Sequence, residues 1–329
     1  MIHPMKFEPV FKETIWGGGR LRSLLKKNAP ENAAVGESWE VADHPNGTST
    51  VVNGELAGKT LHDVFAAFRT DLLGPALAAR FPDRFPLLIK FIDAADRLSL
   101  QVHPGDAYAA LHENGSFGKT EAWYVMAAEP GSRLIAGLKR RTSAAEFERA
   151  LADGGVEDLL NMVPVREGDF LFIPAGRIHA IMPGILLNEI QQNSDITYRV
   201  YDWGRTGNDG RPRTLHVRQS LETIDFGDTD VRPVRSAEAE RLDDRRRLLT
   251  RNAFFTTEKW DFTSIEDSTR EPGSEGCRVL SVISGEGSLA WKEGRIGLRP
   301  GDSLVIPWST GEYGLVSRSG AMTVLNSHI

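Results

Sequence analysis

Short runs of alternating apolar and polar residues, separated by glycine and proline, fill most of the chain. Examples are SLQVHP (99–104), EAWYVMA (121–127), FLFIPAG (170–176), TYRVYDW (197–203), RVLSVIS (278–284) and SLVIPW (303–308). This rhythm is typical of an antiparallel sandwich or barrel, because side chains alternate between the two faces of a strand. The pattern therefore predicts a mainly β protein.

Two segments have apolar residues at helical spacing instead, at 62–81 and 142–163. The second opens with Thr142 or Ser143 as a candidate N-cap, and Glu146 lies near the capping-box position. We expect helical insertions in a mainly β fold.

An internal repeat appears when EGDFLFIPAGRIHAI (167–181) is aligned with RPGDSLVIPWSTGEYGL (299–315). The Gly-Asp pair at 168–169 falls on the pair at 301–302, Pro174 falls on Pro307, and His179 falls on Glu312. The alignment predicts two similar barrels, with a break in the charged, turn-rich stretch around 225–245. We expect a metal-binding domain at 1–235 and a second domain without metal ligands at 236–329.

Bulk properties narrow the classes of function. The 329 residues have a net charge of −6 and a pI near 5.8, which argues against a nucleic-acid-binding protein. Cys277 is the single cysteine, so no intramolecular disulfide can form. No apolar run has the length of a signal peptide core or a membrane span. We expect a cytoplasmic protein, monomeric or weakly homo-oligomeric, without membrane or nucleic-acid partners.

The segment at 98–103 has one apolar face and one face of polar side chains. If it is a strand, one face has Leu98, Leu100 and Val102, and the other has Ser99, Gln101 and His103. It follows PLLIKFIDA (86–94), a continuous apolar run of the kind found inside proteins. Lys90 lies within that run, where a lysine is costly unless it is paired or functional.

A candidate metal site emerges from these segments. A Gly-Asp pair, a strand, a proline and then His179 match the closing half of a cupin motif. The opening half would be Gln101, His103 and Glu121, which together offer nitrogen and oxygen ligands for a divalent metal such as zinc. The alternatives are hydrogen-bonded structural histidines and a Glu121 that pairs with Lys119 or a nearby arginine.

The ordered motifs resemble those of one family. They are WGG (16–18), GESWEVADHPNG (36–47), FPLLIKFIDAADRLSLQVHP (85–104), GKTEAWYV (118–125), IPAGRIHAI (173–181) and NEIQQNSDITYRVYDWGR (188–205). The chain resembles the type I mannose-6-phosphate isomerases of the cupin superfamily, in their shorter bacterial form. The resemblance implies two cupin-type (jelly-roll) β-barrels with short helical insertions and one zinc ion per chain.

The resemblance also implies roles for individual residues. It assigns Gln101, His103, Glu121 and His179 as zinc ligands, Arg199, Lys119, Asp195 and Glu189 as catalytic, and Ser99, Lys90 and Lys119 as substrate-binding. The chain departs from longer relatives by having only a short helical insertion, and GKTEAW replaces the Lys-Pro-Glu of the other subgroup.

The implied reaction is the interconversion of mannose 6-phosphate and fructose 6-phosphate by proton transfer through an enediolate. Lys119, Asp195 and Glu189 are all candidates for the proton shuttle, and Asp195 with Arg199 could instead be a structural ion pair. Two other classes remain open: a non-catalytic cupin that binds sugar phosphates and a metal-dependent cupin oxygenase.

Overall fold

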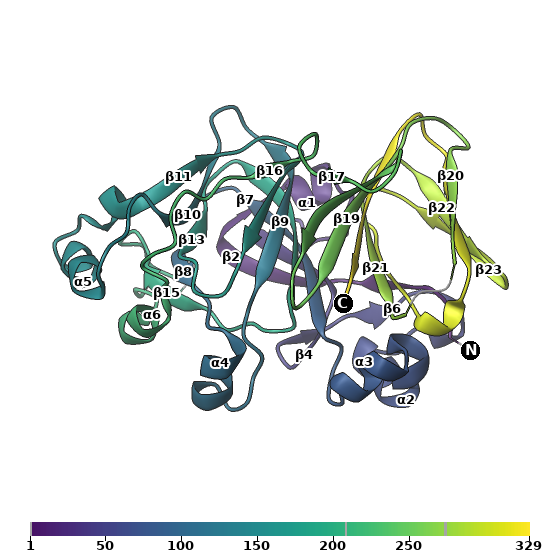
Figure 1. Cartoon of the computed structure of the whole chain (residues 1–329), viewed down its shortest axis with the longest axis horizontal. Coiled ribbons are helices and arrows are strands. Elements are labelled where there is room, and N and C mark those ends of the chain that lie inside the picture. The colour runs from purple at the N-terminus through teal and green to yellow at the C-terminus, as the bar shows by residue number, and fades with distance from the viewer. Residues whose placement is uncertain (1, 208, 273–274) are drawn as a thin grey trace.

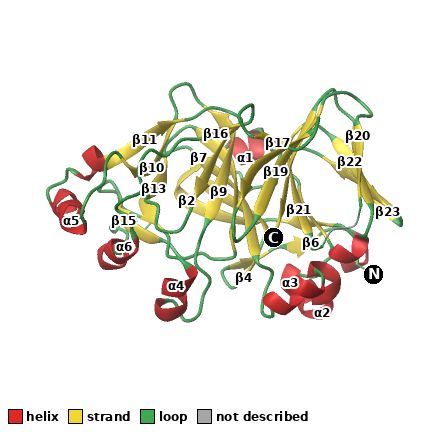
Figure 2. Cartoon of the chain, in the orientation of Figure 1, coloured by secondary structure: helices red, strands yellow, loops and turns green. Residues whose placement is uncertain are grey.

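The structure is a computed structural model that describes residues 2–207, 209–272 and 275–329. It is mainly β, with four large sheets arranged in layers and short helices at the periphery (Figures 1 and 2). This confirms the predicted fold class, although each predicted barrel consists of two facing sheets and not of one closed sheet.

The first sandwich consists of a seven-stranded and a five-stranded sheet. The seven-stranded sheet has the order β16 (Val234–Arg235), β12 (Asp169–Ile173), β9 (Glu121–Ala128), β14 (Ile185–Gln192), β7 (Leu87–Ala94), β2 (Val10–Gly18) and β3 (Val35–Val41). The five-stranded sheet has the order β11 (Leu160–Pro164), β10 (Arg133–Leu138), β13 (His179–Ile181), β8 (Leu100–Val102) and β15 (Tyr198–Tyr201).

The second sandwich consists of an eight-stranded and a four-stranded sheet. The eight-stranded order is β17 (Glu240–Arg241), β18 (Arg246–Arg251), β19 (Thr256–Phe262), β26 (Met322–His328), β21 (Arg278–Ser284), β24 (Ser303–Ile306), β1 (Met5–Glu8) and β6 (Thr50–Val51). The four-stranded order is β20 (Ser268–Glu271), β25 (Tyr313–Ser317), β22 (Gly287–Trp291) and β23 (Gly294–Leu298). A separate hairpin joins β4 (Asp43–His44) to β5 (Gly47–Thr48).

The helices are short. They are α1 (Arg20–Ser23), α2 (Leu61–Leu73), α3 (Pro75–Arg80), α4 (Asp106–His112), α5 (Ala144–Ala152), α6 (Val217–Thr223) and the 3₁₀ turns η1 (Gly54–Leu56), η2 (Val156–Leu159) and η3 (Trp308–Thr310). Among the described residues, no helix has the length and apolar character that crossing a membrane requires.

The two predicted helical segments are confirmed in part. The first segment is divided into α2 and α3 at Gly74, whose φ is 84°. The second forms α5, where Ser143 is the N-cap and accepts a hydrogen bond from the Glu146 backbone N–H. The helical interpretation was wrong beyond this point, because Gly154 and Gly155 follow α5 and residues 160–164 form β11.

Apolar clusters fill the spaces between the layers. One cluster lies between the two sheets of the first sandwich, and another lies between the two sheets of the second. A third cluster takes residues from both the seven-stranded and the eight-stranded sheet, so these two sheets pack back to back. Helices α4, α5 and α6 cover the outer face of the five-stranded sheet (Figure 1).

The chain passes from one sandwich to the other between β16 and β17, since β16 pairs with β12 and β17 pairs with β18. We propose to divide the chain there, into 1–235 and 236–329. Two strands of the first part cross this division: β1 pairs with β24 of the second sandwich, and β6 pairs with β1.

The repeat seen in the sequence has a common turn geometry. Gly168 and Gly301 have φ values of 86° and 85°, and the following aspartates, Asp169 and Asp302, each accept a hydrogen bond from the backbone N–H three residues earlier. In both copies the glycine adopts the left-handed backbone that the turn before the strand requires.

The alternation predicted at 98–103 is confirmed for five residues and wrong for Leu98. Leu100 and Val102 pack into the cluster under the helices, while Ser99, Gln101 and His103 face a cavity between the two sheets. Leu98 packs into the cluster between the sheets and lines the same cavity. Leu98 lies two residues before the start of β8, so the alternation of side chains along the strand does not include it.

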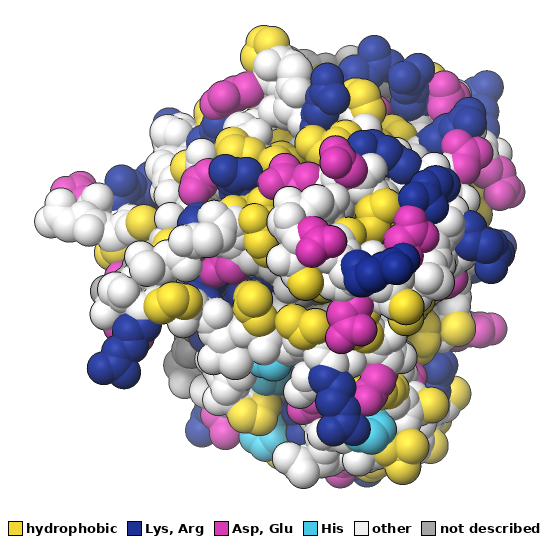
Figure 3. Space-filling view, turned by 90° about the vertical axis from the view of Figure 1, so that its left-hand side faces the viewer, with side chains coloured by type: hydrophobic (Ala, Val, Ile, Leu, Met, Phe, Trp, Pro, Cys, Tyr) yellow, Lys and Arg dark blue, Asp and Glu magenta, His cyan; other side chains and the backbone are white. Residues whose placement is uncertain are grey.

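Charges of both signs are interspersed on the face of the molecule that carries the peripheral helices (Figure 3). That face has no broad area of a single charge, as expected from the overall composition.

Candidate active site

A cavity of about 370 Å³ lies between the two sheets of the first sandwich. Its lining includes all ten residues that sequence reasoning singled out: Lys90, Ser99, Gln101, His103, Lys119, Glu121, His179, Glu189, Asp195 and Arg199. They come from β7, β8, β9, β13, β14, β15 and the loops beside them, which span more than one hundred residues of sequence.

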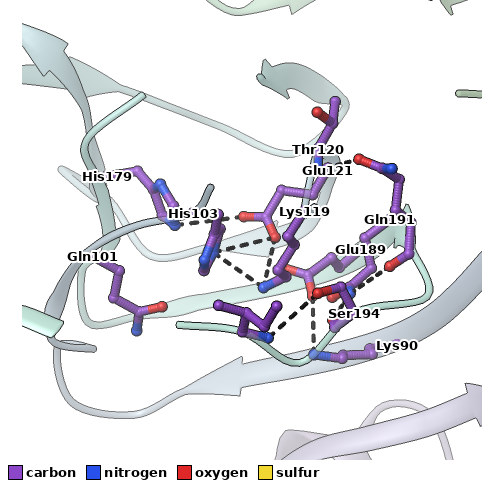
Figure 4. A network of polar contacts seen from close by, with 12 residues as sticks. Lys90, Gln101, His103, Lys119, Thr120, Glu121, His179, Glu189, Gln191 and Ser194 are labelled. Atoms are coloured by element: carbon purple, nitrogen blue, oxygen red, sulfur yellow. Dashed lines mark hydrogen bonds and ion pairs between the residues drawn. The ribbon is translucent and has the colours of Figure 1, made fainter. Parts of the chain in front are cut away.

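A group of metal-ligand type lies at the centre of this cavity (Figure 4). His103, Glu121 and His179 are buried, and their candidate ligand atoms lie within 4.8 Å of one another. The two Nε2 atoms lie 3.6 Å and 3.5 Å from the two carboxylate oxygens of Glu121. Ligands of a tetrahedral zinc ion, about 2.0–2.1 Å from the metal, lie roughly 3.4 Å apart. The three side chains could therefore hold one metal ion.

The protonation of the two histidines suits metal binding. Burial lowers the pKa of His179 to about 4, and burial with the nearby Lys119 lowers the pKa of His103 well below its usual value. Both imidazoles are therefore neutral at neutral pH, as metal ligands must be. The Nδ1 atom of His179 lies 2.9 Å from the Arg177 carbonyl oxygen, and this hydrogen bond leaves the Nε2 lone pair directed into the site.

Gln101 lies beside the three ligand candidates. In the backbone register it is paired with His179 on one side and with Arg199 on the other. Its amide nitrogen donates a hydrogen bond of 3.1 Å to the Ser99 hydroxyl. This bond orients the amide and leaves its oxygen for another partner.

Lys119 approaches the same centre. Its Nζ atom lies 2.8 Å from Glu121 Oε2 and 3.1 Å from His103 Nε2. The pairing of Glu121 with Lys119, expected as one alternative to a metal ligand, therefore does form. The contact with Lys119 is an ion pair, and Oε2 of Glu121 is buried without a hydrogen bond among the described residues. The carboxylate can therefore pair with Lys119 and still offer an oxygen to a metal ion.

Lys90 is held by two carboxylates. Its ammonium group lies 3.4 Å from Glu37 and 3.3 Å from Glu189, and it lies over the Trp39 ring. Each carboxylate also accepts a hydrogen bond from an indole N–H, Glu37 from Trp39 and Glu189 from Trp123. Burial alone would lower the pKa of Lys90, but Glu37 and Glu189 raise it above its ordinary value, so the lysine stays charged.

Asp195, Thr197 and Arg199 occupy alternate positions along the chain, and all three line the cavity. The alternative of an ion pair between Asp195 and Arg199 is not found among the ion pairs of the described residues. Asp195 instead accepts a hydrogen bond from the Asn46 amide, and Arg199 donates to the carbonyl oxygen of Thr214. Both charges are therefore available to a ligand.

Arginines gather at one end of the cavity. Arg199 and Arg213 both line it, and Arg213 is held by Asp202, which also binds Arg205. Burial lowers the pKa of Arg199, and the positive charge of Arg213 lowers it further. Arg213 pairs with Asp202, and Arg205 pairs with both Asp202 and Asp96. Arg199 has no carboxylate partner among the described residues, so its charge leaves this end positive.

Sequence reasoning missed Glu37 and Arg213. Glu37 lies within the motif GESWEVADHPNG, but only the pairing of β3 with β7 brings it to Lys90. Arg213 lies in the loop between β15 and α6, and no local pattern there indicates that it reaches the cavity.

The fold and the site define a cupin-type β protein with a buried group of metal-ligand type. The sequence family described as phosphomannose isomerase type I, catalytic domain, matches residues 5–124, which include Gln101, His103 and Glu121. The family described as mannose-6-phosphate isomerase, cupin domain, matches residues 245–329.

Individual proteins are similar over nearly the whole chain. A probable mannose-6-phosphate isomerase of Bacillus subtilis is 38% identical, with 95% of this chain and 96% of that one covered. The mannose-6-phosphate isomerase of Streptococcus mutans is 38% identical, with 93% of each covered. A crystal structure of the mannose 6-phosphate isomerase from Bacillus subtilis is 32% identical, covers 100% of both chains and superposes with a TM-score of 0.87. The chain belongs to the family of type I mannose-6-phosphate isomerases.

Proposed function

We propose that this protein is a zinc-dependent isomerase that interconverts mannose 6-phosphate and fructose 6-phosphate. One observation carries the proposal: the residues that the family pattern implies, although distant in sequence, line a single cavity. The membership in the family supplies the substrate, and the cavity supplies groups for metal binding, proton transfer and charge stabilisation.

Gln101, His103, Glu121 and His179 are the proposed ligands of one zinc ion per chain. The separations around Glu121, the neutral imidazoles and the free amide oxygen of Gln101 support this set. A zinc ion bound there would supply Lewis-acid stabilisation of negative charge on the sugar oxygens.

The reaction moves a proton between C2 and C1 of the open-chain sugar, and a side chain has to take the proton from one carbon and return it to the other. Lys119, Asp195 and Glu189 are the proposed candidates. Glu189 has one buried oxygen without a hydrogen bond, and Asp195 has a single hydrogen bond, from the Asn46 amide, both counted among the described residues. Arg199 is proposed to stabilise the negative charge that develops on the sugar oxygens.

The substrate also carries a phosphate dianion, and the protein is net acidic. Lys90 lies between two carboxylates and Lys119 beside one, so we propose that these lysines and Ser99 contact the sugar. The positive end formed by Arg199 and Arg213 then suits the phosphate, because guanidinium groups match phosphate oxygens in geometry and charge.

The proposed setting is the cytoplasm, with a monomer or a weak homo-oligomer as the working form. The single cysteine, Cys277, is buried, and burial raises its pKa to about 12, so the thiol is inert at neutral pH.

A coupled assay tests the proposal. The protein is supplied with mannose 6-phosphate, and formation of fructose 6-phosphate is followed before and after treatment with a chelator. We expect turnover that is lost on chelation and restored by zinc. Absence of turnover by zinc-loaded, folded protein would favour a binding protein, and oxygen consumption would favour an oxygenase.

A further inference from the structure

The segment before α6 is tied back to strand β15. The Thr214 carbonyl oxygen accepts a hydrogen bond of 2.8 Å from Nη1 of Arg199, and the backbone N–H of His216 donates to the Arg199 carbonyl oxygen at 2.8 Å. The backbone N–H of Arg199 in turn donates to Nδ1 of His216 at 3.2 Å. Arg213 immediately precedes Thr214, so these bonds keep its backbone close to Arg199 at the end of the cavity.

The side chain of Arg213 is oriented by one carboxylate. Its Nε and Nη2 atoms donate hydrogen bonds of 2.7 Å and 2.5 Å to the two oxygens of Asp202. Two parallel bonds between a guanidinium and a carboxylate fix the plane of the guanidinium as well as its position. Asp202 is 5% exposed, so solvent does not compete freely for these bonds.

Asp202 is itself held by a residue outside the cavity lining. Nη2 of Arg205 donates to Oδ1 of Asp202 at 2.8 Å, and Arg205 also pairs with Asp96 and donates to the Arg97 carbonyl oxygen. Burial alone would raise the pKa of Asp202, but the hydrogen bonds from Arg213 and Arg205 lower it below its ordinary value. The carboxylate is therefore ionised at neutral pH and joins an anchored arginine to the one at the cavity.

Arg213 keeps donors for a ligand. A guanidinium group has five N–H donors, and Asp202 accepts one from Nε and one from Nη2. Nη1 of Arg213 has no hydrogen bond among the described residues. The side chain is 22% exposed and lines the cavity, so the part of the guanidinium that Asp202 does not use can reach a bound anion.

Asp202 has two opposite effects on the binding of an anion. Its negative charge lies beside Arg213 and, by charge alone, weakens the attraction for a phosphate group. Its two hydrogen bonds hold the guanidinium in one orientation, and a donor that is already ordered loses less conformational freedom when a ligand binds. Because the two effects have opposite signs, a substitution that changes only one of them can tell which prevails.

We propose that Asp202 is a positioning residue that fixes Arg213 for the phosphate group of the sugar and so sets the preference of the cavity for phosphorylated sugars. A planar guanidinium in a fixed orientation can form parallel hydrogen bonds with two phosphate oxygens. Asp202 does not line the cavity, so it acts through Arg213. The inference rests on the proposed function, because it takes a sugar phosphate as the ligand.

The test is calorimetric titration of the zinc-loaded full chain with glucitol 6-phosphate, which has no carbonyl group and therefore binds without being isomerised. Asp202→Asn removes the negative charge, and Asp202→Glu keeps it but moves the carboxylate by one methylene group. Both variants should bind glucitol 6-phosphate roughly tenfold more weakly, the order expected for losing a hydrogen bond between charged groups. In the isomerase assay, KM for mannose 6-phosphate should rise with little change in kcat.

A double-mutant cycle separates positioning from a general structural role. In protein that carries Arg213→Ala, Asp202→Asn should cause no further loss of affinity, since the arginine that Asp202 positions is then absent. Asp228→Asn is the matched control. Asp228 accepts hydrogen bonds of 2.7 Å and 2.8 Å from Nε and Nη2 of Arg177, and neither residue lines the cavity. This variant should leave the affinity for glucitol 6-phosphate unchanged.

The proposal is overturned if Asp202→Asn binds glucitol 6-phosphate as tightly as the wild type or more tightly, since the charge of Asp202 would then prevail. It is also overturned if the losses caused by Asp202→Asn and Arg213→Ala add, or if the wild type does not bind glucitol 6-phosphate at millimolar concentration. Failure of the isomerase proposal is a separate result: a protein that shows the expected binding pattern but does not convert mannose 6-phosphate supports the role of Asp202 and contradicts the isomerase.

Discussion

Buried charges in the site are compensated by partners that are themselves buried. Lys90 is 3% exposed and Lys119 is 6% exposed, and both lie beside carboxylates. Burying a charge without such partners costs roughly several kcal/mol. The neighbouring carboxylates are therefore needed to keep these lysines charged inside the protein.

Removing a metal-ligand histidine should abolish metal binding without unfolding the protein. His179→Ala or His103→Ala deletes one of the proposed nitrogen ligands, while the apolar clusters of both sandwiches stay intact. Elemental analysis should find about one zinc per wild-type chain and a large loss in either variant, with unchanged far-UV circular dichroism. Two tightly bound zinc ions per wild-type chain, or a variant that retains full metal content, would refute this ligand set.

The two arginines of the cavity should affect different kinetic constants. Arg199→Lys replaces a planar fork with a point charge at the proposed oxyanion, so kcat should fall roughly 100- to 1000-fold. Arg213→Ala should chiefly raise KM for mannose 6-phosphate. Arg205→Ala is the matched control, since Arg205 shares the Asp202 partner but does not line the cavity. Equal effects of Arg213→Ala and Arg205→Ala on KM would exclude a direct phosphate contact by Arg213.

His328, in the second sandwich, should make stability depend on pH. Burial lowers its pKa to about 4 from the ordinary 6.5, and Arg278 contributes. Between these pH values the unfolded chain binds the proton and the folded chain does not. The free energy of unfolding should therefore fall as pH drops from 6.5 towards 4, by roughly 1–3 kcal/mol from this residue.

His328→Gln removes that contribution, whereas the acid loss caused by His103 and His179 is present in both proteins and cancels. Urea unfolding at pH 7 and pH 4.5 measures the difference. A variant that loses as much stability as the wild type on acidification would show that His328 is not kept neutral by the fold.

Among the elements, the two turns of the repeat have the same left-handed backbone conformation at glycine but different neighbouring atoms. Gly168 has open space, since the nearest atom to an added methyl group is the Tyr124 hydroxyl at 4.0 Å. At Gly301 an added methyl group would lie 2.9 Å from the Leu25 side chain. The first position therefore requires glycine for its backbone conformation alone, and the second also for space.

Alanine at these two positions should separate the two causes. Gly168→Ala should destabilise the protein by about 1 kcal/mol, the order of the left-handed backbone penalty. Gly301→Ala should cost about 1–2 kcal/mol more because of the contact with Leu25. Urea denaturation midpoints give the comparison. Equal costs would mean that Leu25 moves aside freely.

At the scale of the whole molecule, local patterns in the sequence predicted much of the architecture. The period of two at 98–103 predicted a shared face for Ser99, Gln101 and His103, which line the cavity, and the two copies of the repeat have turns of the same geometry. Each of these features depends on neighbours in sequence. The mainly β class and the helical capping by Ser143 could be predicted for the same reason.

Other features depend on contacts that no local pattern contains. The pairing of β1 with β24 joins residues about three hundred positions apart, and Glu37 reaches Lys90 only through the pairing of two strands. Arg213 reaches the cavity from a loop whose path is set by tertiary packing. Leu98 does not lie on its predicted face, because the strand begins two residues after it.

In the proposed reaction, side chains of this cavity move a proton between C2 and C1 of a hexose 6-phosphate. The most direct measurement is nuclear magnetic resonance of the reaction in heavy water, with zinc-loaded protein and mannose 6-phosphate. We expect fructose 6-phosphate with deuterium at C1, because a proton held on Lys119, Asp195 or Glu189 exchanges in part with solvent before it is returned. Fructose 6-phosphate without any deuterium would contradict the solvent-exchanging base, and failure to convert mannose 6-phosphate would contradict the isomerase itself.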